Sequence, residues 1–202
     1  MLTVFSILGA LGTIFIPFPQ AKRAYFHSTK GVSAATYIAL CSIAAIFIPH
    51  GIRIDSLLLS VSHVFSVIFC SVIIYSIARD NKNKSIIFIL VVIVVVMLGI
   101  YFLSNDIGKT VLISSIVSFL RLPQLYKACF APEIHGISVL TWLMAVVANI
   151  SWLIVAIIKD DTPLILGASL SVFLSASIVV VTSIRQHKLK EVSTSSSTSL
   201  EI

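Results

Sequence analysis

Long apolar runs separated by short polar turns make up most of this chain of 202 residues. A helix needs roughly 20 apolar residues to cross about 30 Å of hydrocarbon, and runs of about this length recur along the chain. Composition agrees, because 58% of the residues are hydrophobic and only 11% are charged, unlike soluble domains. The pattern predicts an all-α membrane protein with seven transmembrane helices, at 2–20, 32–49, 56–78, 85–103, 107–125, 137–158 and 163–184.

The basic residues of the turns predict how the chain crosses the bilayer. Of the 14 Lys and Arg residues, only Arg53, Lys109 and Lys159 fall on one side, and the rest fall on the other. Cytoplasmic turns carry the excess of Lys and Arg, so the N-terminus is expected outside and the C-terminus in the cytoplasm. The net charge of +6 then reflects topology and not nucleic-acid binding. We expect an integral protein of the cell (plasma) membrane.

Polar residues lie scattered inside the apolar runs and form no catalytic motif. The sequence has no metal-ligand cluster, phosphate-binding glycine loop or nucleophile elbow, so we expect no enzyme, cofactor or metal site. Cys41, Cys70 and Cys129 fall where disulfides do not form readily. The tail from Ser193 to Ser199 is almost pure Ser and Thr, and we expect it to be disordered.

Two parts of the chain match each other at a shift of about a hundred residues. Pro19-Gln20 recurs as Pro123-Gln124, and Lys30-Gly31-Val32-Ser33 recurs as His135-Gly136-Ile137-Ser138. A copy with three helices inserts upside down unless one extra helix precedes it, and the fourth run, nearly all Ile, Val, Leu and Phe, suits that role. The predicted parts are a first repeat at 1–78, a linker at 79–106, a second repeat at 107–184 and a tail at 185–202.

The repeated motifs resemble the PQ-loop family, and within it the two-repeat SWEET-type transporters, whose one-repeat relatives are the SemiSWEETs. The resemblance covers about residues 5–184 and rests on both Pro-Gln pairs, on Gly-x-Ser-x-x-Thr-aromatic from Gly31 and from Gly136, and on Ser151-Trp152 before an acidic turn and Pro163. It implies a 3+1+3 bundle of parallel repeats with a solute cavity between them near mid-membrane.

The two repeated prolines are candidate hinges. A proline near a helix end removes a backbone hydrogen bond and allows bending, and Gln20 and Gln124 could bond the carbonyls freed near Pro19 and Pro123. Alternatively, these prolines simply end helices at the interface. The resemblance implies the hinge, because the family uses these prolines for alternating access.

The second helix of each copy carries a stripe that begins polar and ends aromatic, at Phe47 in one copy and at Trp152 in the other. The resemblance implies that these rings stack on a sugar, although Trp152 also suits an interfacial aromatic belt. Asn149 could bond a solute hydroxyl, or it could form an interhelical hydrogen bond worth about 0.6 kcal/mol.

The third helix of each copy departs from the family pattern. The resemblance implies an asparagine there, but His63 stands at that position in the first copy and Ser169, or Ala168, in the second. A membrane histidine, whose imidazole titrates near pH 6.5 when unperturbed, is suited to proton coupling, or else donates a fixed hydrogen bond.

These observations favour a transporter that moves a small polar solute, in the first place a sugar, by alternating access. The expected pocket is lined by Phe47, His63, Asn149, Trp152 and Ser169. A proton-coupled carrier of an amino acid or a similar solute is the alternative. A receptor of the PQ-loop fold is a second alternative, but it needs fixed cations. Apart from Lys109 at the start of the fifth run, Arg121 is the one Lys or Arg within a run. Two repeats suffice for a monomeric pore and do not forbid a homo-oligomer.

Overall fold

The computed structural model describes residues 1–27, 29, 32–130 and 139–198, and in these ranges every regular element is a helix. Six helical stretches are long and apolar enough to cross a membrane, with α1 and α2 counted together. The prediction of an all-α chain with several such helices is confirmed. The helices are α1 (Leu2–Phe15), α2 (Phe18–Phe26), α3 (Ala34–Arg53), α4 (Leu57–Asp80), α5 (Ser85–Leu103), α6 (Asp106–Phe130), α7 (Val139–Ile158) and α8 (Thr162–Thr198).

The fifth predicted run falls within α6, which is not among those six stretches. This helix has 25 residues, long enough to cross a bilayer. It also carries Asp106, Lys109, Arg121 and Lys127, and these charges lower its hydropathy. The exact seven-span arrangement is therefore a proposal.

The first predicted run is divided by a turn at Ile16 and Pro17, where α1 ends and α2 begins. Pro17 has no N–H, so the carbonyl of Thr13, four residues earlier, loses its usual helical partner. Ser66 Oγ of α4 donates a hydrogen bond to that carbonyl at 3.2 Å. A side chain from another helix thus stabilises the break.

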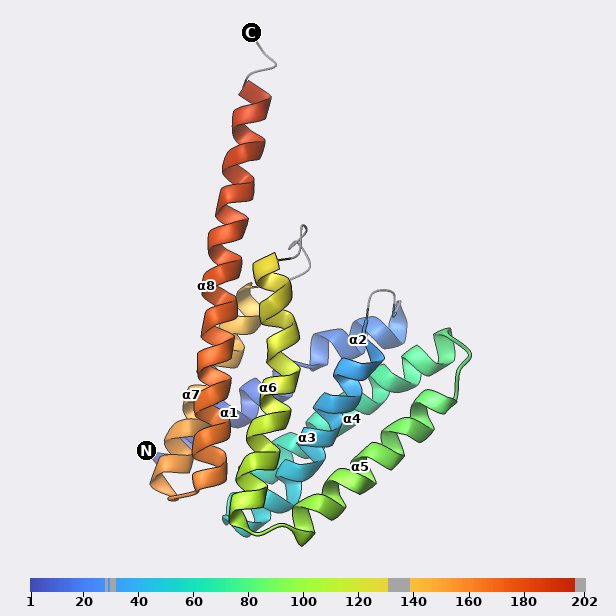
Figure 1. Cartoon of the computed structure of the whole chain (residues 1–202), viewed down its shortest axis with the longest axis vertical. Coiled ribbons are helices and arrows are strands. Elements are labelled where there is room, and N and C mark those ends of the chain that lie inside the picture. Colours follow the sequence, from blue (N-terminus) through green and yellow to red (C-terminus); the bar gives the residue numbers. More distant parts are fainter. Residues whose placement is uncertain (28, 30–31, 131–138, 199–202) are drawn as a thin grey trace.

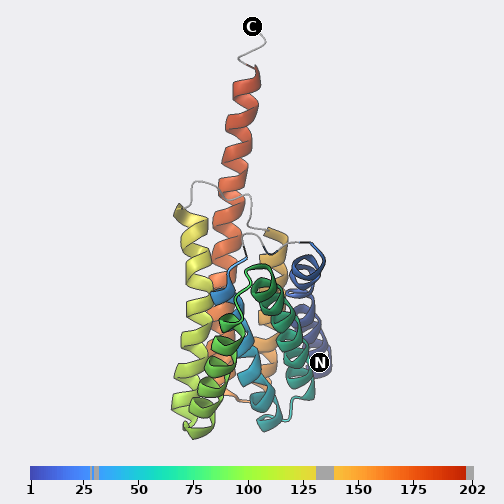
Figure 2. The same ribbon diagram turned by 90° about the vertical axis from the view of Figure 1, so that its right-hand side faces the viewer.

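The last helix is longer than the sequence pattern predicts. We expected a disordered tail from Ser193 to Ser199, but α8 continues as a helix to Thr198, and Ser199 lies outside the described residues. Extending an existing helix avoids the cost of nucleation, which explains why a polar segment can continue it. Figures 1 and 2 show this extension standing beyond the bundle.

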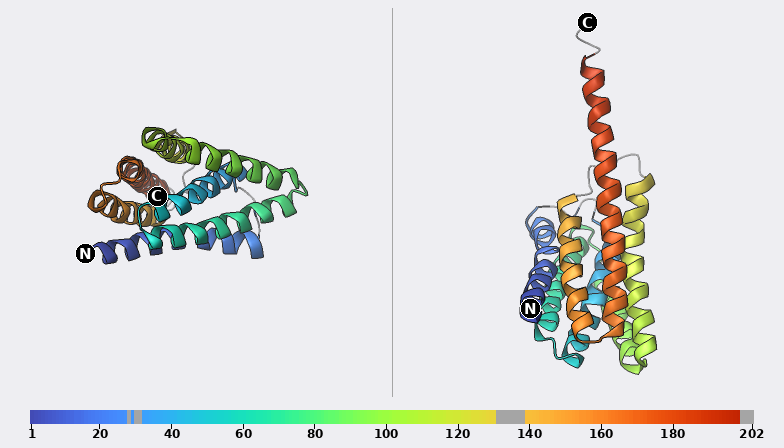
Figure 3. Two further views of the ribbon diagram at one scale, coloured as in Figure 1. Left: turned by 90° about the horizontal axis from the view of Figure 1, so that it is seen from below. Right: turned by 90° about the vertical axis from the view of Figure 1, so that its left-hand side faces the viewer.

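Two groups of helices, one on each side of α5 in the sequence, pack together. In the first half, α4 packs against α1, α2 and α3, and in the second half α8 packs against α6 and α7. The halves meet where α1 contacts α7 and α3 contacts α6. Helix α5 packs against α3 and α4 at the edge of the bundle (Figure 3) and buries only Leu90 and Tyr101. This exposure agrees with the predicted lipid-facing linker helix.

Two glycines bring α1 and α7 into close contact. A Cβ added to Gly9 would lie 2.8 Å from Cε2 of Trp152, and a Cβ added to Gly12 would lie 2.5 Å from Cβ of Ala148. Both distances are too short for real carbon atoms, so the contact requires glycine at both positions. This approach places Trp152 of the second half against the first half.

Candidate functional site

Three of the five predicted pocket residues come together between the halves. The ring centroids of Phe47 and His63 lie 4.7 Å apart, and those of His63 and Trp152 lie 6.5 Å apart. Phe47 and Trp152 lie six positions before the ends of α3 and α7, and His63 lies six positions after the start of α4. These helix ends lie near the turn that contains Asp161, and six positions are about 9 Å along a helix. We call these three residues the aromatic layer, and we call that end of the bundle, which the charge pattern assigns outside, the outer end.

Trp152 is fixed by a chain of hydrogen bonds that joins the two halves. Its Nε1 donates to Thr13 Oγ1 at 3.0 Å, and Thr13 Oγ1 donates to the carbonyl of Gly9 at 2.8 Å. The residue is 5% exposed. This burial contradicts the alternative that Trp152 belongs to a lipid-facing aromatic belt.

His63 is held by its own helix. Nδ1 lies 2.8 Å from the carbonyl of Leu59, so Nδ1 carries the hydrogen and donates it. Nε2 makes no hydrogen bond with the described residues. One nitrogen is therefore fixed, and the other remains able to bind a solute or a proton.

Asn149 and Ser169 do not join the aromatic layer through hydrogen bonds in the described part of the chain. Asn149 Nδ2 donates to the carbonyl of Ala145, in the same helix, at 2.6 Å. This bond replaces the interhelical one considered as an alternative. Ser169 is partly buried on α8. A role for either residue in binding stays a prediction.

Neither of the repeated prolines ends a helix. Pro123 lies inside α6, and Pro19 lies within the first turn of α2. The amides of Gln20 and Gln124 make no hydrogen bond to the described residues, and it is Ser66 that bonds the carbonyl freed by Pro17. The break in the first half thus lies at Pro17, two residues before the predicted hinge.

A polar cluster that the sequence pattern did not predict joins the halves at the outer end. His50 is 0% exposed, and its Nε2 lies 3.0 Å from Asp161 Oδ1 while its Nδ1 lies 3.1 Å from Tyr101 Oη. Arg53 donates from Nη2 to Asp161 Oδ2 at 2.7 Å and from Nη1 to Asp106 Oδ1 at 2.9 Å. We call these five residues the outer cluster.

Asp161 is the centre of the outer cluster. Its side chain is 5% exposed, and Oδ1 also accepts the N–H of Leu164 at 2.8 Å, as a cap of α8. Burial raises the pKa of Asp161, but the hydrogen bond and charge of His50, with the Leu164 amide and Arg53, outweigh it and lower the pKa overall. The carboxylate therefore stays charged and holds two side chains of α3.

One sequence signal could have pointed to this cluster. His50 and Arg53 are three residues apart, so they share a face of α3. The sequence places Arg53 in one outward turn and Asp160 and Asp161 in another. The pairing could not be inferred, because nothing local specifies which turn meets which helix.

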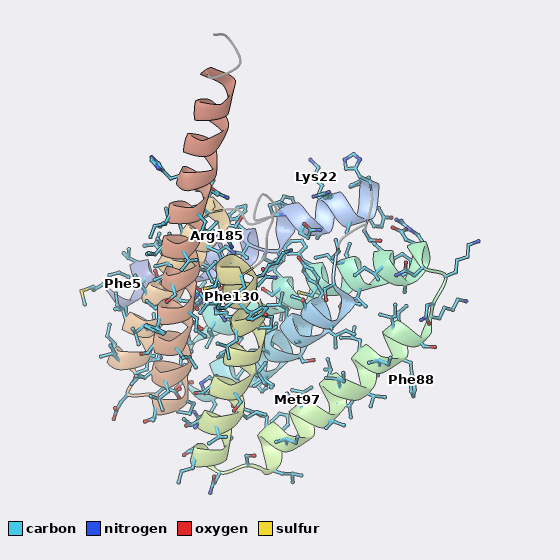
Figure 4. The ribbon with its side chains drawn as sticks, turned by 45° about the horizontal axis from the view of Figure 1, so that its top comes forward. Phe5, Lys22, Phe88, Met97, Phe130 and Arg185 are labelled. Atoms are coloured by element: carbon cyan, nitrogen blue, oxygen red, sulfur yellow. The ribbon has the colours of Figure 1, made fainter. Side chains whose placement is uncertain are left out.

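The contacts of two arginines at the opposite end lie within each half. Arg79 of α4 donates to the carbonyl of Tyr25 at 3.4 Å in the first half. Arg185 of α8 donates to the carbonyl of Ala128 at 2.7 Å in the second half, beside the end of α6 near Phe130 (Figure 4). Each bond ties the last helix of a half, α4 or α8, to the first stretch of the same half. That stretch is α1 with α2 in the first half and α6 in the second. The outer cluster, by contrast, contains ion pairs between the halves.

A hollow on the outside of the bundle, between α1 and α7, is not connected to these polar residues. Its lining is apolar and includes Leu8, Leu11, Phe15, Leu143 and Val147, all of them exposed. In a bilayer this surface faces lipid chains, so we assign it no solute.

No protein-family model matches this chain, and no curated protein matches it. Its function is therefore inferred from the motifs of the sequence and from the two layers of contacts between the halves.

Proposed function

We propose that this protein is a SWEET-type transporter that moves a small polar solute, in the first place a sugar, by alternating access between two three-helix repeats. The observation that carries the proposal is the order of layers between the halves. The outer cluster ties the halves together at one end, and the aromatic layer lies directly beneath it, where the ring centroids of Phe47 and His50 are 5.9 Å apart. A closed gate above a binding surface is the arrangement that such a carrier needs.

The helix contacts support two copies of one unit. In each half the third helix packs against the first and the second, and the first helix of each half contacts the second helix of the other. The arginine bonds at Tyr25 and Ala128 recur in the same way. Under this proposal α6 is the first helix of the second repeat. It crosses the membrane as the fifth of seven spans, and α5 is the linker.

The outer cluster supports a specific mechanism. While the bonds of the outer cluster are intact, the outer end is closed and a solute reaches the aromatic layer from the cytoplasmic side. The apolar face of a sugar ring then stacks on Trp152 or Phe47. Opening to the outside requires the halves to separate, which breaks the bonds of Asp161 to His50 and Arg53. The helix break at Pro17 and the proline inside α6 are the places where such a motion can bend the bundle.

A second candidate, a proton-coupled carrier of an amino acid or a similar solute, is favoured by His63. Its Nε2 has no partner among the described residues, and its ring packs between Phe47 and Trp152. An imidazole inside the binding layer could bind a proton and the solute together. The receptor alternative lacks such support, since Arg121 is a single cation within the spans.

The test is solute exchange in proteoliposomes loaded with labelled sugars and labelled amino acids. We expect exchange of at least one sugar, and we expect Trp152→Ala to lower it strongly. Trp142→Ala is the matched control, because it removes the same ring from the same helix away from the aromatic layer. Exchange of neither class by the folded protein, or equal exchange by both variants, would refute the proposal.

A further inference from the structure

Arg121 of α6 is a partly buried cation that belongs neither to the outer cluster nor to the aromatic layer. Its Nε donates to Ser175 Oγ of α8 at 3.2 Å. Ser175 is 0% exposed and lies thirteen residues after Thr162, where α8 begins. This distance is about 20 Å along a helix, so Ser175 lies near the middle of the predicted span at 163–184. Arg121 itself stands in the cytoplasmic half of the predicted run at 107–125.

No carboxylate neutralises Arg121 within the described residues. None of the ion pairs there includes it, whereas Arg53 contacts two acidic side chains. All eight Asp and Glu residues of the chain lie in turns, at helix ends or in the tail. Of these, Glu133 follows α6 in the sequence and lies outside the described residues.

Hydroxyl groups line the helix face that meets Arg121. Ser175 accepts one of the five N–H groups of the guanidinium. Ser171, one turn nearer the outer end on the same face, is 3% exposed and makes no hydrogen bond with the described residues. Within the described residues, the other N–H groups of the guanidinium and the hydroxyl of Ser171 make no hydrogen bond, so several donors remain for one acceptor group.

Arg121 lies farther from the outer end than the aromatic layer does. The aromatic layer is about 9 Å from the outer end, and Arg121 is about 20 Å from it. Side chains on a helix lean towards its N-terminus, and the N-terminus of α6 is at the outer end. Arg121 therefore leans towards the aromatic layer.

We propose that Arg121 binds an anionic group of the transported solute, so that the solute is a small polar acid, such as a sugar acid. This inference rests on the proposed transport function. An unpaired charge inside a membrane is costly and marks a functional site, and a guanidinium binds a carboxylate through two parallel hydrogen bonds. The depth of Ser175 favours a solute over the headgroup of a lipid.

The test compares acids with their neutral counterparts on the full-length protein in detergent at constant ionic strength. The pairs are glucuronate with glucose and glutamate with glutamine, and the readouts are the Kd and the shift of the Tm. We expect the acid of at least one pair to bind more tightly, and Arg121→Gln to weaken that binding by about tenfold or more without changing the binding of its neutral counterpart. Lys127→Gln removes an exposed cation from the same helix and is the matched control.

The stability of the variant without ligand separates binding from a structural role. We expect Arg121→Gln to have an unchanged or higher Tm, because it removes a partly buried charge that has no ion pair within the described residues, while keeping a donor for Ser175. A lower Tm in Arg121→Gln that Glu133→Gln reproduces would show an ion pair between these residues and overturn the inference. No preference for the acid in either pair would overturn it too. The inference would also fail if Arg121→Gln changed only the Tm shift caused by phosphatidylglycerol relative to phosphatidylcholine, because Arg121 would then bind a lipid headgroup.

Exchange in proteoliposomes separates this inference from the transport proposal. If glucose exchanges and the acids do not, the solute is neutral and the inference fails while transport stands. If an acid binds through Arg121 and nothing exchanges, the anion site stands and the transport proposal fails.

Discussion

Replacing Asp161 by Asn tests whether the outer cluster is a gate. The change keeps the volume of the side chain and removes the charge that holds His50 and Arg53. Removing one member of a buried ion pair costs about 3–5 kcal/mol. Arg53 is 34% exposed, so its share is screened, and we expect the closed state to lose about 2–3 kcal/mol. This loss shifts the ratio of closed to open protein by roughly 30- to 150-fold.

The shift is measurable as access of a thiol reagent to the space between the two layers. Val155 is fully buried, one turn from Trp152 towards the outer end. In a protein with Cys41, Cys70 and Cys129 replaced by Ala, a cysteine at Val155 is alkylated by a membrane-impermeant reagent added outside. We expect Asp161→Asn to accelerate this alkylation by a factor of the same order as the shift.

Asp160→Asn is the matched control, because Asp160 is an exposed neighbour whose backbone has a φ of 50°, which asparagine tolerates. Equal alkylation rates in Asp161→Asn and Asp160→Asn would refute the gate. In a double-mutant cycle, Arg53→Gln should add little to Asp161→Asn, since both remove the same bond.

The gate also predicts a dependence on pH. The pKa of Asp161 is lowered in the folded protein, so its stabilising effect is fully present above the ordinary aspartate value of 3.8. It is lost as the pH falls through the lowered value. The thiolate fraction of any cysteine falls with pH, so the rate at position 155 is compared with the rate of the same cysteine in Asp161→Asn. We expect this ratio to rise below about pH 4.

Three further predictions concern the aromatic layer and the prolines. Pro19→Ala or Pro123→Ala should sharply lower exchange in proteoliposomes while the Tm stays nearly constant, because a restored N–H stiffens the bend; normal rates in both variants would exclude a hinge. Trp152→Ala should raise the Kd of the solute more than Phe47→Ala, because the indole offers more stacking area and is fixed by a bond to the other half; equal and negligible changes in the Kd would remove both rings from the binding surface. His63→Gln should abolish accumulation driven by an inward proton gradient and spare passive exchange if the carrier is proton-coupled; wild-type flux that ignores the gradient would exclude coupling.

The positions of the apolar helices and the duplication could be inferred from the sequence alone. Helix α5 has the predicted bounds, Ser85–Leu103, because an unbroken apolar run ends at polar turns on both sides. The duplication shows in short motifs that keep their spacing. These features are local, and hydropathy and turn chemistry act on neighbouring residues whatever the rest of the chain does. Proline positions are local too, but the extent of the bend is not, since the helix breaks at Pro17 and continues through Pro123.

The partners of the polar side chains were decided by the tertiary structure. His50 and Asp161 are 111 positions apart, and only the packing of α3 against the second half brings them within hydrogen-bond distance. Asn149 bonds its own helix, and Ser66 bonds the carbonyl that Pro17 leaves free. In a membrane, buried polar groups must find partners inside the protein. Several carbonyls and side chains can satisfy each group, and the choice follows from which helices touch and at what depth.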